Sequence, residues 1–386
     1  MFDFDKIIDR KNTDSLKWNV KNGELAMWVA DMDFETAPAV KNAVKKVAEF
    51  GVFGYKTVSE KWYNAIVNWW RKRHGVTFEK DWLCFCTGVI PAVTSMVKRL
   101  TEPGDNVAIF TPVYDIFFHS IENSGRLTLE CPLIFDGESY SIDFEDLERK
   151  LALPSTKLLI LCNPHNPVGK IWDKVTLQKI GEVCEKHGVK VISDEIHCDL
   201  TEPGKNYVPF ISASETCKKI SVTCVSASKA FNLAGMQSAA VVIPDEKLFK
   251  IVERGLNSDE VAEPNSFAIE SAVAAFSEGG SWLDELREYI SINRKTLEQF
   301  IKKELPDLNV IKQDATYLIW IDVGKITDDA HLLCKHVRKT TGLKITAGGQ
   351  YRGNGKTFVR INVACPKAVL KNGLERLKNG VNSFIG

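Results

Sequence analysis

Neither sign of charge is in excess in this sequence of 386 residues. Lysine and arginine together number 50, aspartate and glutamate together also number 50, and the formal net charge at pH 7 is zero. Proteins that bind nucleic acids usually carry a basic excess. The balance of charges therefore argues against nucleic acid as a main partner.

Long apolar runs are also missing. The longest, such as 158–162, have the length of a strand, whereas a membrane-spanning helix needs about 20 apolar residues. The first residues, 1–6, mix charged and apolar side chains and lack the basic start and apolar core of a signal peptide. We expect a soluble, cytoplasmic protein that has no membrane partner.

The ten cysteines show neither a metal-binding pattern nor a disulfide framework. No Cys-x-x-Cys pair occurs, and no group of cysteine and histidine residues has the spacing of zinc ligands. Several cysteines lie in or beside apolar, strand-like runs, where a free thiol packs as a small hydrophobe: Cys84, Cys86, Cys162, Cys224 and Cys365. We expect reduced thiols in a core and no metal site.

The middle of the chain alternates between apolar runs and helical patterns. Helices are expected at 38–50, 60–75, 144–151 and 175–187, and strands are expected at 107–110, 157–162, 189–192, 220–225 and 239–243. Near-continuous apolar strands that alternate with helices indicate an α/β fold, in which helices cover both faces of a mostly parallel sheet.

The last third of the chain predicts a smaller α+β domain. Helical stretches at 245–254, 266–277 and 281–303 precede two strands at 316–321 and 357–363, with a helix near 330–340 between them. We therefore expect an N-terminal arm with part of the small domain at 1–45, a large domain at 46–270 and the small domain at 271–386.

The glycine-rich segment 347–355 lies between those two strands. It does not match the spacing of a dinucleotide-binding or phosphate-binding loop, and a strand follows it instead of a helix. We expect a mobile loop there and no nucleotide site.

Lys229 is the most informative residue of the sequence. It follows the apolar run 220–225 and stands between Ser226, Ser228 and small or apolar residues. A partly desolvated lysine has a lowered pKa and can react with a carbonyl group, and neighbouring hydroxyl groups suit a phosphate. A single lysine at a strand end more often reaches solvent, so this interpretation depends on the residues around it.

Polar groups follow several other strands of the same predicted sheet. Asn166 lies in a turn after 157–162, and Asp194 follows 189–192, where an unpaired carboxylate is costly unless a cation, such as a protonated ring nitrogen, pairs with it. An ion-paired or helix-capping aspartate is the alternative. Because open α/β sheets bind ligands at the carboxyl ends of their strands, these groups are expected to share one edge.

Two further features suit a phosphorylated aromatic ligand at that edge. Gly88 precedes a helix-compatible stretch that reaches Leu100, and free N–H groups at a helix start bind phosphate. Tyr114 follows strand 107–110, where its ring can stack on another ring.

The most specific segments are Asn-Pro-His-Asn-Pro at 163–167 and Ser-Asp-Glu-Ile-His at 193–197. With others, they cover nearly the whole chain: 28–34, 54–55, 111–114, 161–169, 193–197, 226–235 and 359–366. Together they resemble the MalY/PatB-type cystathionine β-lyases. These C–S lyases are fold-type I pyridoxal-phosphate (PLP) enzymes of the class I/II aminotransferase-like superfamily.

The resemblance implies that PLP is the cofactor and that Lys229 is the catalytic residue. Lys229 would hold PLP as a Schiff base and then move the proton of the substrate Cα. Asp194 would pair with the pyridinium nitrogen, Asn166 would bond the ring 3′-oxygen, and Tyr114 would stack on the ring. His197 would lie beside the cofactor.

The resemblance also implies a phosphate site and a substrate site. The phosphate would be bound by Gly88, Val89, Ile90, Ser226 and Ser228, and by Tyr55 from a second subunit of a homodimer with shared active sites. Arg360 would clamp the substrate α-carboxylate with its planar fork, although an arginine on a strand surface is ordinary by itself. The substrate pocket would be shaped by Trp28, Ala30, Tyr114 and Tyr317.

Two positions depart from the broad aminotransferase pattern and agree with the lyase branch. Gln237 stands where many aminotransferases have a phosphate-binding arginine, and His197 stands where many have a tyrosine. The expected reaction is β-elimination of cystathionine or a related cysteine thioether, which yields a thiol, pyruvate and ammonia. The alternatives are an aminotransferase and a regulator-binding protein with residual lyase activity.

Overall fold

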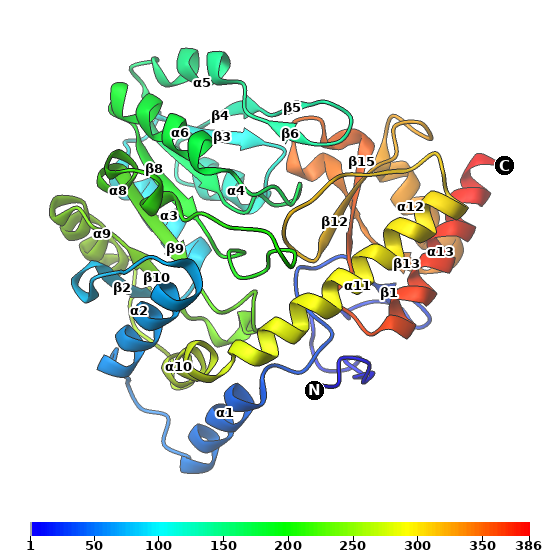
Figure 1. Ribbon diagram of the computed structural model, residues 1–386, viewed down its shortest axis with the longest axis horizontal. Helices are drawn as coiled ribbons and strands as arrows, with labels where there is room; N and C mark the ends of the chain where they lie inside the picture. The colour runs from blue at the N-terminus through cyan, green and yellow to red at the C-terminus, as the bar shows by residue number, and fades with distance from the viewer. Residues whose placement is uncertain (1) are drawn as a thin grey trace.

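The computed structural model describes residues 2–386 and contains one large mixed sheet (Figure 1). Its seven strands are, in spatial order, β2 (Leu83–Cys86), β10 (Ala239–Val242), β9 (Ser221–Val225), β8 (Lys190–Asp194), β7 (Thr156–Cys162), β3 (Asn106–Thr111) and β4 (Leu127–Pro132). Every strand runs parallel to the others except β10, which pairs antiparallel with both β2 and β9. The predicted α/β fold with a mostly parallel sheet is confirmed.

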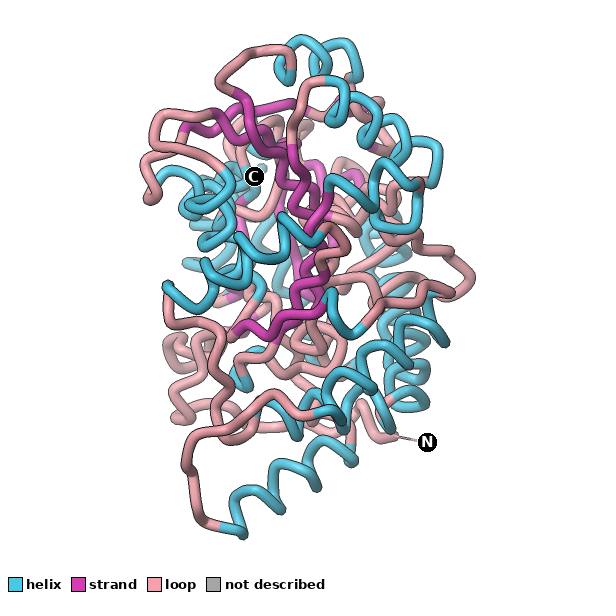
Figure 2. The backbone as a smooth tube through the Cα atoms, turned by 90° about the vertical axis from the view of Figure 1, so that its left-hand side faces the viewer, coloured by secondary structure: helices cyan, strands magenta, loops and turns pink. Residues whose placement is uncertain are grey.

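Helices cover both faces of this sheet, and Figure 2 shows the strands between two helical layers. One face packs against α3 (Val89–Leu100), α4 (Ile116–Glu122) and α9 (Glu246–Ser258). The other packs against α5 (Phe144–Leu151), α6 (Lys174–Lys186), α7 (Phe210–Ala213) and α8 (Glu215–Ile220).

Burial on both faces explains the apolar runs of the strands. Along β7, Leu158 and Ile160 point into one apolar cluster, whereas Leu159 and Leu161 point into the other. Side chains of a strand alternate between the faces of its sheet, so a strand covered on both sides needs apolar residues at every position.

The second half of the chain builds a small antiparallel sheet. Its strands are, in spatial order, β11 (Asn309–Val310), β12 (Leu318–Asp322), β15 (Phe358–Asn362) and β14 (Thr346–Ala347), and the neighbouring helices are α11 (Gly280–Glu304), α12 (Ala330–Thr341) and α13 (Lys367–Ile385). The N-terminal strand β1 (Leu25–Ala26) pairs in parallel with β13 (Leu343–Lys344), so the start of the chain joins this part of the molecule. The expected α+β unit is present, and its limits at 1–45, 46–270 and 271–386 stay a prediction.

The remaining elements connect or flank the two sheets. They are β5 (Ile134–Phe135), β6 (Tyr140–Ser141), α1 (Pro38–Phe50), α2 (Glu60–His74), α10 (Ala268–Glu278) and the short 3-10 turns Lys80–Trp82, Ala234–Met236, Gly348–Tyr351 and Gly355–Thr357. Figure 1 shows the long helix α11 between α10 and the small sheet.

The structure corrects the expectation of a mobile loop for the glycine-rich segment 347–355. Instead of an irregular mobile loop, 347–355 contains the turn Gly348–Tyr351 and the start of a second turn, and the ring of Tyr351 is fully buried. A Cβ atom at Gly348 would collide with the Gly355 carbonyl and the Trp320 ring. These glycines therefore permit close packing of two turns.

All ten cysteines are free and buried, which confirms the expectation of core thiols. Among residues 2–386, no helix combines the length and the apolarity that a membrane crossing requires.

Candidate active site

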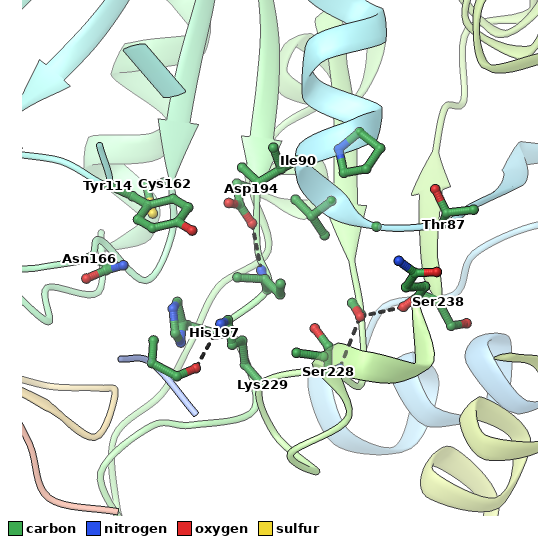
Figure 3. A pocket seen from close by; sticks show the side chains of 18 residues that line it. Thr87, Ile90, Tyr114, Cys162, Asn166, Asp194, His197, Ser228, Lys229 and Ser238 are labelled. Carbon is green, nitrogen blue, oxygen red and sulfur yellow. Dashed lines mark hydrogen bonds between the residues drawn. The ribbon is translucent and has the colours of Figure 1, made fainter. Parts of the chain in front are cut away.

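A cavity opens where strands of the large sheet end and α3 begins (Figure 3). It is lined by most of the residues predicted for the cofactor site: Gly88, Val89, Ile90, Tyr114, Asn166, Asp194, His197, Ser226, Ser228 and Lys229, together with Ala30. Four of the predicted residues do not line it, namely Tyr55, Trp28, Tyr317 and Arg360.

The antiparallel strand β10 keeps the Lys229 segment at this edge of the sheet. A parallel neighbour of β9 would need a crossover of a dozen or more residues that returns to the opposite edge. Because β10 runs back beside β9, the connection 226–238 stays at the carboxyl end of β9. That connection carries both Ser226 and Lys229 into the cavity.

Lys229 is half-buried, and its ammonium donates a hydrogen bond of 2.9 Å to the carbonyl of Ala30. Burial lowers the pKa of Lys229 to about 8, and the nearby charge of Arg360 adds to the effect. A lysine with such a pKa is present in part as the free amine near neutral pH, the form that reacts with carbonyl groups.

Asp194 is the last residue of β8, between Cys162 of β7 and Cys224 of β9. Its carboxylate accepts a hydrogen bond of 3.0 Å from the backbone of Ile196, and no ion pair involves it among the described residues. Burial raises its pKa to about 6. The ion-paired alternative thus finds no partner among the described residues, whereas the bond from Ile196 is a local capping bond of the kind that the other alternative expects. The carboxylate keeps room for a cationic ligand atom.

The start of α3 also lines the cavity. Gly88 precedes the helix, and no side chain caps the first turn. The N–H groups of Val89 and Ile90 have no partner within the helix, since the first turn of any α-helix leaves them free. Nearby, the Ser226 hydroxyl donates to the Ser238 carbonyl at 2.6 Å and accepts from the Ser228 amide at 3.1 Å.

Arg360 connects the small sheet to this site. It lies in β15, is 5% exposed, and donates hydrogen bonds to the Asn166 side chain at 3.1 Å and to the Trp28 carbonyl at 3.2 Å. Its Nε atom has no partner, and no carboxylate of the described chain pairs with it. A buried, unpaired guanidinium is costly, so the geometry suits an anionic ligand.

The segment that contains Trp28 and Ala30 contacts the site through its backbone. The Ala30 carbonyl accepts from Lys229 and also from the hydroxyl of Tyr317 at 3.0 Å. The Trp28 ring points elsewhere, because its indole nitrogen bonds the carbonyl of Lys17 and its face contacts Lys344. Trp28 and Tyr317 thus lie beside the cavity and do not line it.

His197 lies in the cavity wall, and its ring contacts the Tyr317 ring edge-on at a centroid distance of 6.4 Å. Burial lowers its pKa to about 3, with Lys229 and Arg360 adding to the effect. His197 is therefore a neutral imidazole at physiological pH. Tyr55, in contrast, is 100% exposed and lies outside the cavity.

Sequence reasoning assigned no role to several lining residues: Thr87, Pro91, Cys162, Ile196, Ala234, Gln237 and Ser238. Thr87, Pro91 and Ile196 stand next to assigned residues, and Gln237 was noted only as a departure from the aminotransferase pattern. Proximity to a predicted strand end was the available signal for the others. It also assigned no role to Asn232 and Asn362. The Asn362 amide donates to the carbonyls of Val29 and Asp31, both at 2.6 Å, and thereby fixes the Ala30 carbonyl between them.

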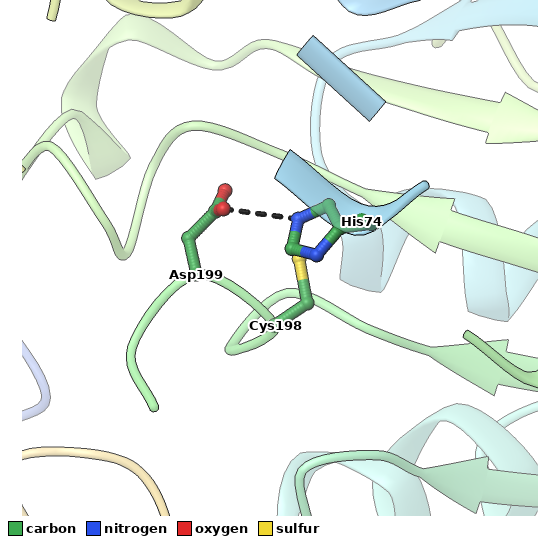
Figure 4. Close-up of side chains that lie close together, drawn as sticks. All are labelled: His74, Cys198 and Asp199. Carbon is green, nitrogen blue, oxygen red and sulfur yellow. Dashed lines mark hydrogen bonds and ion pairs between the residues drawn. The ribbon is translucent and has the colours of Figure 1, made fainter. Parts of the chain in front are cut away.

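A second cluster of titratable groups joins His74 of α2 with the two residues that follow His197. His74, Cys198 and Asp199 approach closely enough to be considered as metal ligands (Figure 4). The Asp199 carboxylate, however, already accepts hydrogen bonds from His74 and from the Trp69 indole, both near 3.0 Å. Burial raises the pKa of the Cys198 thiol well above its ordinary value, so it keeps its proton. The cluster is satisfied internally.

The large sheet, the lysine after β9 and the aspartate that ends β8 define the architecture of a fold-type I PLP-dependent enzyme. The chain belongs to the family described as aminotransferase class I and II, whose model matches residues 26–377. The expected membership in this superfamily is confirmed.

Individual relatives cover almost the full chain. Cystathionine beta-lyase PatB of Bacillus subtilis is 43% identical, with 97% of this chain and 98% of that protein covered. Protein MalY of Escherichia coli is 31% identical, with 99% of this chain and 100% of that protein covered. The structure of cystalysin from Treponema denticola, which contains a pyridoxal 5′-phosphate cofactor, matches with a TM-score of 0.96 and 32% identity over 99% of each chain.

The residues of the cavity fit PLP. The ligand has an aldehyde, a basic ring nitrogen and a phosphate, and the cavity offers the amine of Lys229, the unpaired carboxylate of Asp194 and the open first turn of α3. Each group of the cofactor has a chemically matched partner in the same cavity.

Proposed function

We propose that this chain is a PLP-dependent C–S lyase of the cystathionine β-lyase type, which cleaves cysteine thioethers such as cystathionine to a thiol, pyruvate and ammonia. The observation that carries the proposal is that Lys229 and Asp194 line the same cavity, and that the buried Arg360 beside it has no anionic partner among the described residues. The full-length similarity to PatB supports the choice of the thioether reaction within the family.

Bound PLP would supply an electron sink for the negative charge that develops at the substrate Cα. Lys229 would hold the cofactor, and its amine would then move the Cα proton, since its lowered pKa makes the free amine accessible. Asp194 would bind the ring nitrogen and keep it protonated. The first turn of α3 would bind the phosphate, with Ser226 and Ser228 beside it.

Arg360 would bind the substrate α-carboxylate and orient the Cα–H bond toward Lys229. Its guanidinium is already held by Asn166 and the Trp28 carbonyl, so little side-chain freedom is lost on binding. Tyr114 would cover the ring face of the cofactor. His197 is neutral and would contribute packing and a hydrogen-bonding nitrogen rather than a charge.

The site would be completed by a second copy of the chain. Tyr55 is 100% exposed in the single chain, and Phe50, Val52 and Phe53 before it are also exposed. An exposed apolar stretch of this kind suits a protein interface. We propose a homodimer in which Tyr55 of each subunit reaches the phosphate of the other.

The experiment that tests this function starts from the purified chain with PLP. We expect visible absorbance from the bound cofactor and continuous release of pyruvate and thiol from cystathionine when no keto acid is present. Lys229→Ala should remove both the turnover and the wild-type absorbance while the far-ultraviolet circular dichroism is retained.

Two outcomes would contradict the proposal. If cystathionine converts the cofactor once, in stoichiometric amount, and no pyruvate accumulates, the chain is an aminotransferase instead. If Lys229→Ala keeps the wild-type absorbance, the PLP assignment itself is wrong.

A further inference from the structure

A fully buried tyrosine of the turn Gly348–Tyr351 contacts the arginine of the candidate site. The Cζ atom of Arg360 lies over the Tyr351 ring, 4.9 Å from the ring centroid. Tyr351 is 0% exposed and does not line the cofactor cavity. It can therefore act on a ligand of the cavity through Arg360 and not by direct contact.

The Tyr351 ring and the hydrogen-bond partners of Arg360 act on the guanidinium in different ways. The side chain of Asn166 and the carbonyl of Trp28 each accept one hydrogen bond from it, whereas its Nε atom has no partner. An aromatic face attracts a cation through the ring quadrupole. The ring thus lowers the free-energy cost of the buried positive charge without neutralising it as a carboxylate would, so the arginine stays free to pair with an anion.

Packing fixes the position of the Tyr351 ring. The ring contacts the Trp320 ring edge-on at a centroid distance of 5.6 Å. The Tyr351 carbonyl accepts a hydrogen bond of 3.0 Å from the amide of Val113, the residue before Tyr114. The Tyr351 hydroxyl, although buried, makes no hydrogen bond of normal geometry. The fold therefore uses the ring of this residue and not its hydroxyl group.

We propose that Tyr351 is a positioning residue for the substrate α-carboxylate, because its ring holds the Arg360 guanidinium in place before a ligand arrives. A side chain that is already ordered loses less conformational entropy on binding, and this gain appears as affinity. The inference rests on the proposed function, in which Arg360 binds that carboxylate. Without the ring, Arg360 would keep its charge and would sample more orientations.

Paired ligands that cannot react test this role. 2-Aminoisobutyrate has no hydrogen on Cα and no leaving group on Cβ, and its amide has a carboxamide in place of the carboxylate. We expect the wild-type holoenzyme, titrated with each ligand and followed by its cofactor absorbance, to bind the carboxylate more tightly. Tyr351→Leu should weaken binding of the carboxylate about tenfold and leave binding of the amide nearly unchanged. Tyr351→Phe keeps the ring and should stay within about twofold of the wild type.

Tyr140→Leu is the matched control, because Tyr140 is a buried tyrosine that also contacts Trp320. Its hydroxyl accepts a hydrogen bond of 3.1 Å from the Trp320 indole, and its ring stacks on that of Phe135, whereas Arg360 lies over Tyr351. Tyr140→Leu should lower the thermal unfolding midpoint, as Tyr351→Leu does, and should keep the wild-type ratio of carboxylate to amide affinity. If Tyr351→Leu does not fold, Tyr351→Met, which fills more of the ring volume, takes its place with the same expected loss.

Three results would overturn the inference. They are a wild type that binds both ligands equally, an equal loss of both ligands in Tyr351→Leu, and the same selective loss in Tyr140→Leu or in Tyr351→Phe.

The lyase function is tested separately, by the release of pyruvate from cystathionine. If the selective loss in Tyr351→Leu appears although no thioether yields pyruvate, the lyase function is wrong and the positioning role stands. If pyruvate forms and Tyr351→Leu keeps the wild-type ratio of affinities, the positioning role is wrong and the lyase function stands.

Discussion

Burial acts on Asp194 and Lys229 in the same direction, toward the neutral form of each. The pKa of Asp194 rises to about 6 and that of Lys229 falls to about 8, and desolvation is the main cause in both cases. A cationic nitrogen on a ligand would stabilise the charged carboxylate of Asp194 that burial disfavours. The free amine of Lys229, which burial favours, is the form that reacts with a carbonyl carbon.

The lowered pKa of Lys229 predicts how the protein takes up its cofactor. Between pH 7 and pH 9, the free-amine fraction of a lysine with a pKa of about 8 rises from roughly one tenth to roughly nine tenths. The rate at which the apoprotein develops the absorbance of bound PLP should rise over this range and level off above it. A rate that continues to climb toward pH 10.5 would indicate an ordinary lysine, and Lys229→Ala serves as the blank.

Asp194→Asn should have opposite effects on the apoprotein and on the loaded enzyme. The folded pKa of Asp194, about 6, lies above its ordinary value of 3.8, so its contribution to stability is fully present below pH 3.8 and is lost as pH rises through 6. At pH 7.5 the variant apoprotein should therefore be more stable by about 3 kcal/mol. The amide can still accept from the Ile196 amide.

Urea unfolding checks this prediction. The gain in the midpoint should be clear at pH 7.5 without PLP and should largely vanish at pH 4. With PLP present the order should reverse, because the variant cannot pair with the protonated ring nitrogen. A variant that is less stable than the wild type in the apo form would show that the carboxylate is already well paired.

At the scale of elements, the connections decide the site more than the strands do. The connection between β9 and β10 holds Lys229 at the sheet edge, and Asn362 at the end of β15 fixes the carbonyls around Ala30. The turn Gly348–Tyr351 follows β14 of the small sheet, and the side chain of its Gln350 donates a hydrogen bond to Asp115. Local packing of these connections is therefore a condition for the geometry of the site.

Gly348 and Gly349 test that packing within one turn. A Cβ atom at Gly348 would collide with the Gly355 carbonyl, the Trp320 ring and the Phe358 carbonyl, whereas a Cβ at Gly349 meets nothing within 4 Å. Gly348→Ala should lower the free energy of unfolding by about 1–3 kcal/mol, and Gly349→Ala should leave it nearly unchanged. Equal thermal unfolding midpoints for the two variants would show that the turn can relax.

At the scale of the whole molecule, the two sheets meet at the candidate site. Lys229 and Asp194 come from the large sheet, Arg360 comes from the small sheet, and the Ala30 carbonyl comes from the N-terminal segment. The proposed second subunit would add Tyr55, which points to solvent in the single chain.

Mixed dimers test whether the sites are shared between subunits. A subunit with Lys229→Ala and a subunit with Tyr55→Ala would form a hybrid in which one site carries both changes and the other carries neither. After unfolding and refolding together, we expect about a quarter of the wild-type activity above the sum of the separate variants. Activity equal to that sum would place Tyr55 outside the partner's site.

Much of the fold was readable from the sequence because its signals are local. Strands buried on both faces, such as β7, leave a continuous apolar run, and α5 was predicted with its observed limits, Phe144–Leu151. Helix α13 was missed, although Leu370, Leu374, Leu377 and Val381 lie on one face at helical spacing. The antiparallel direction of β10 was not predicted, because direction depends on where a connection packs and not on the strand itself.

The sequence by itself determined which residues stand at the carboxyl ends of parallel strands. Asn166, Asp194 and Lys229 could be grouped in advance, since parallel strands bring these ends to one edge. Only the tertiary structure decided that Arg360 bonds Asn166 across 194 residues, and that the Trp28 ring turns away from the cavity toward Lys344. Side-chain direction between two sheets is set by packing among distant segments, and no local pattern encodes it.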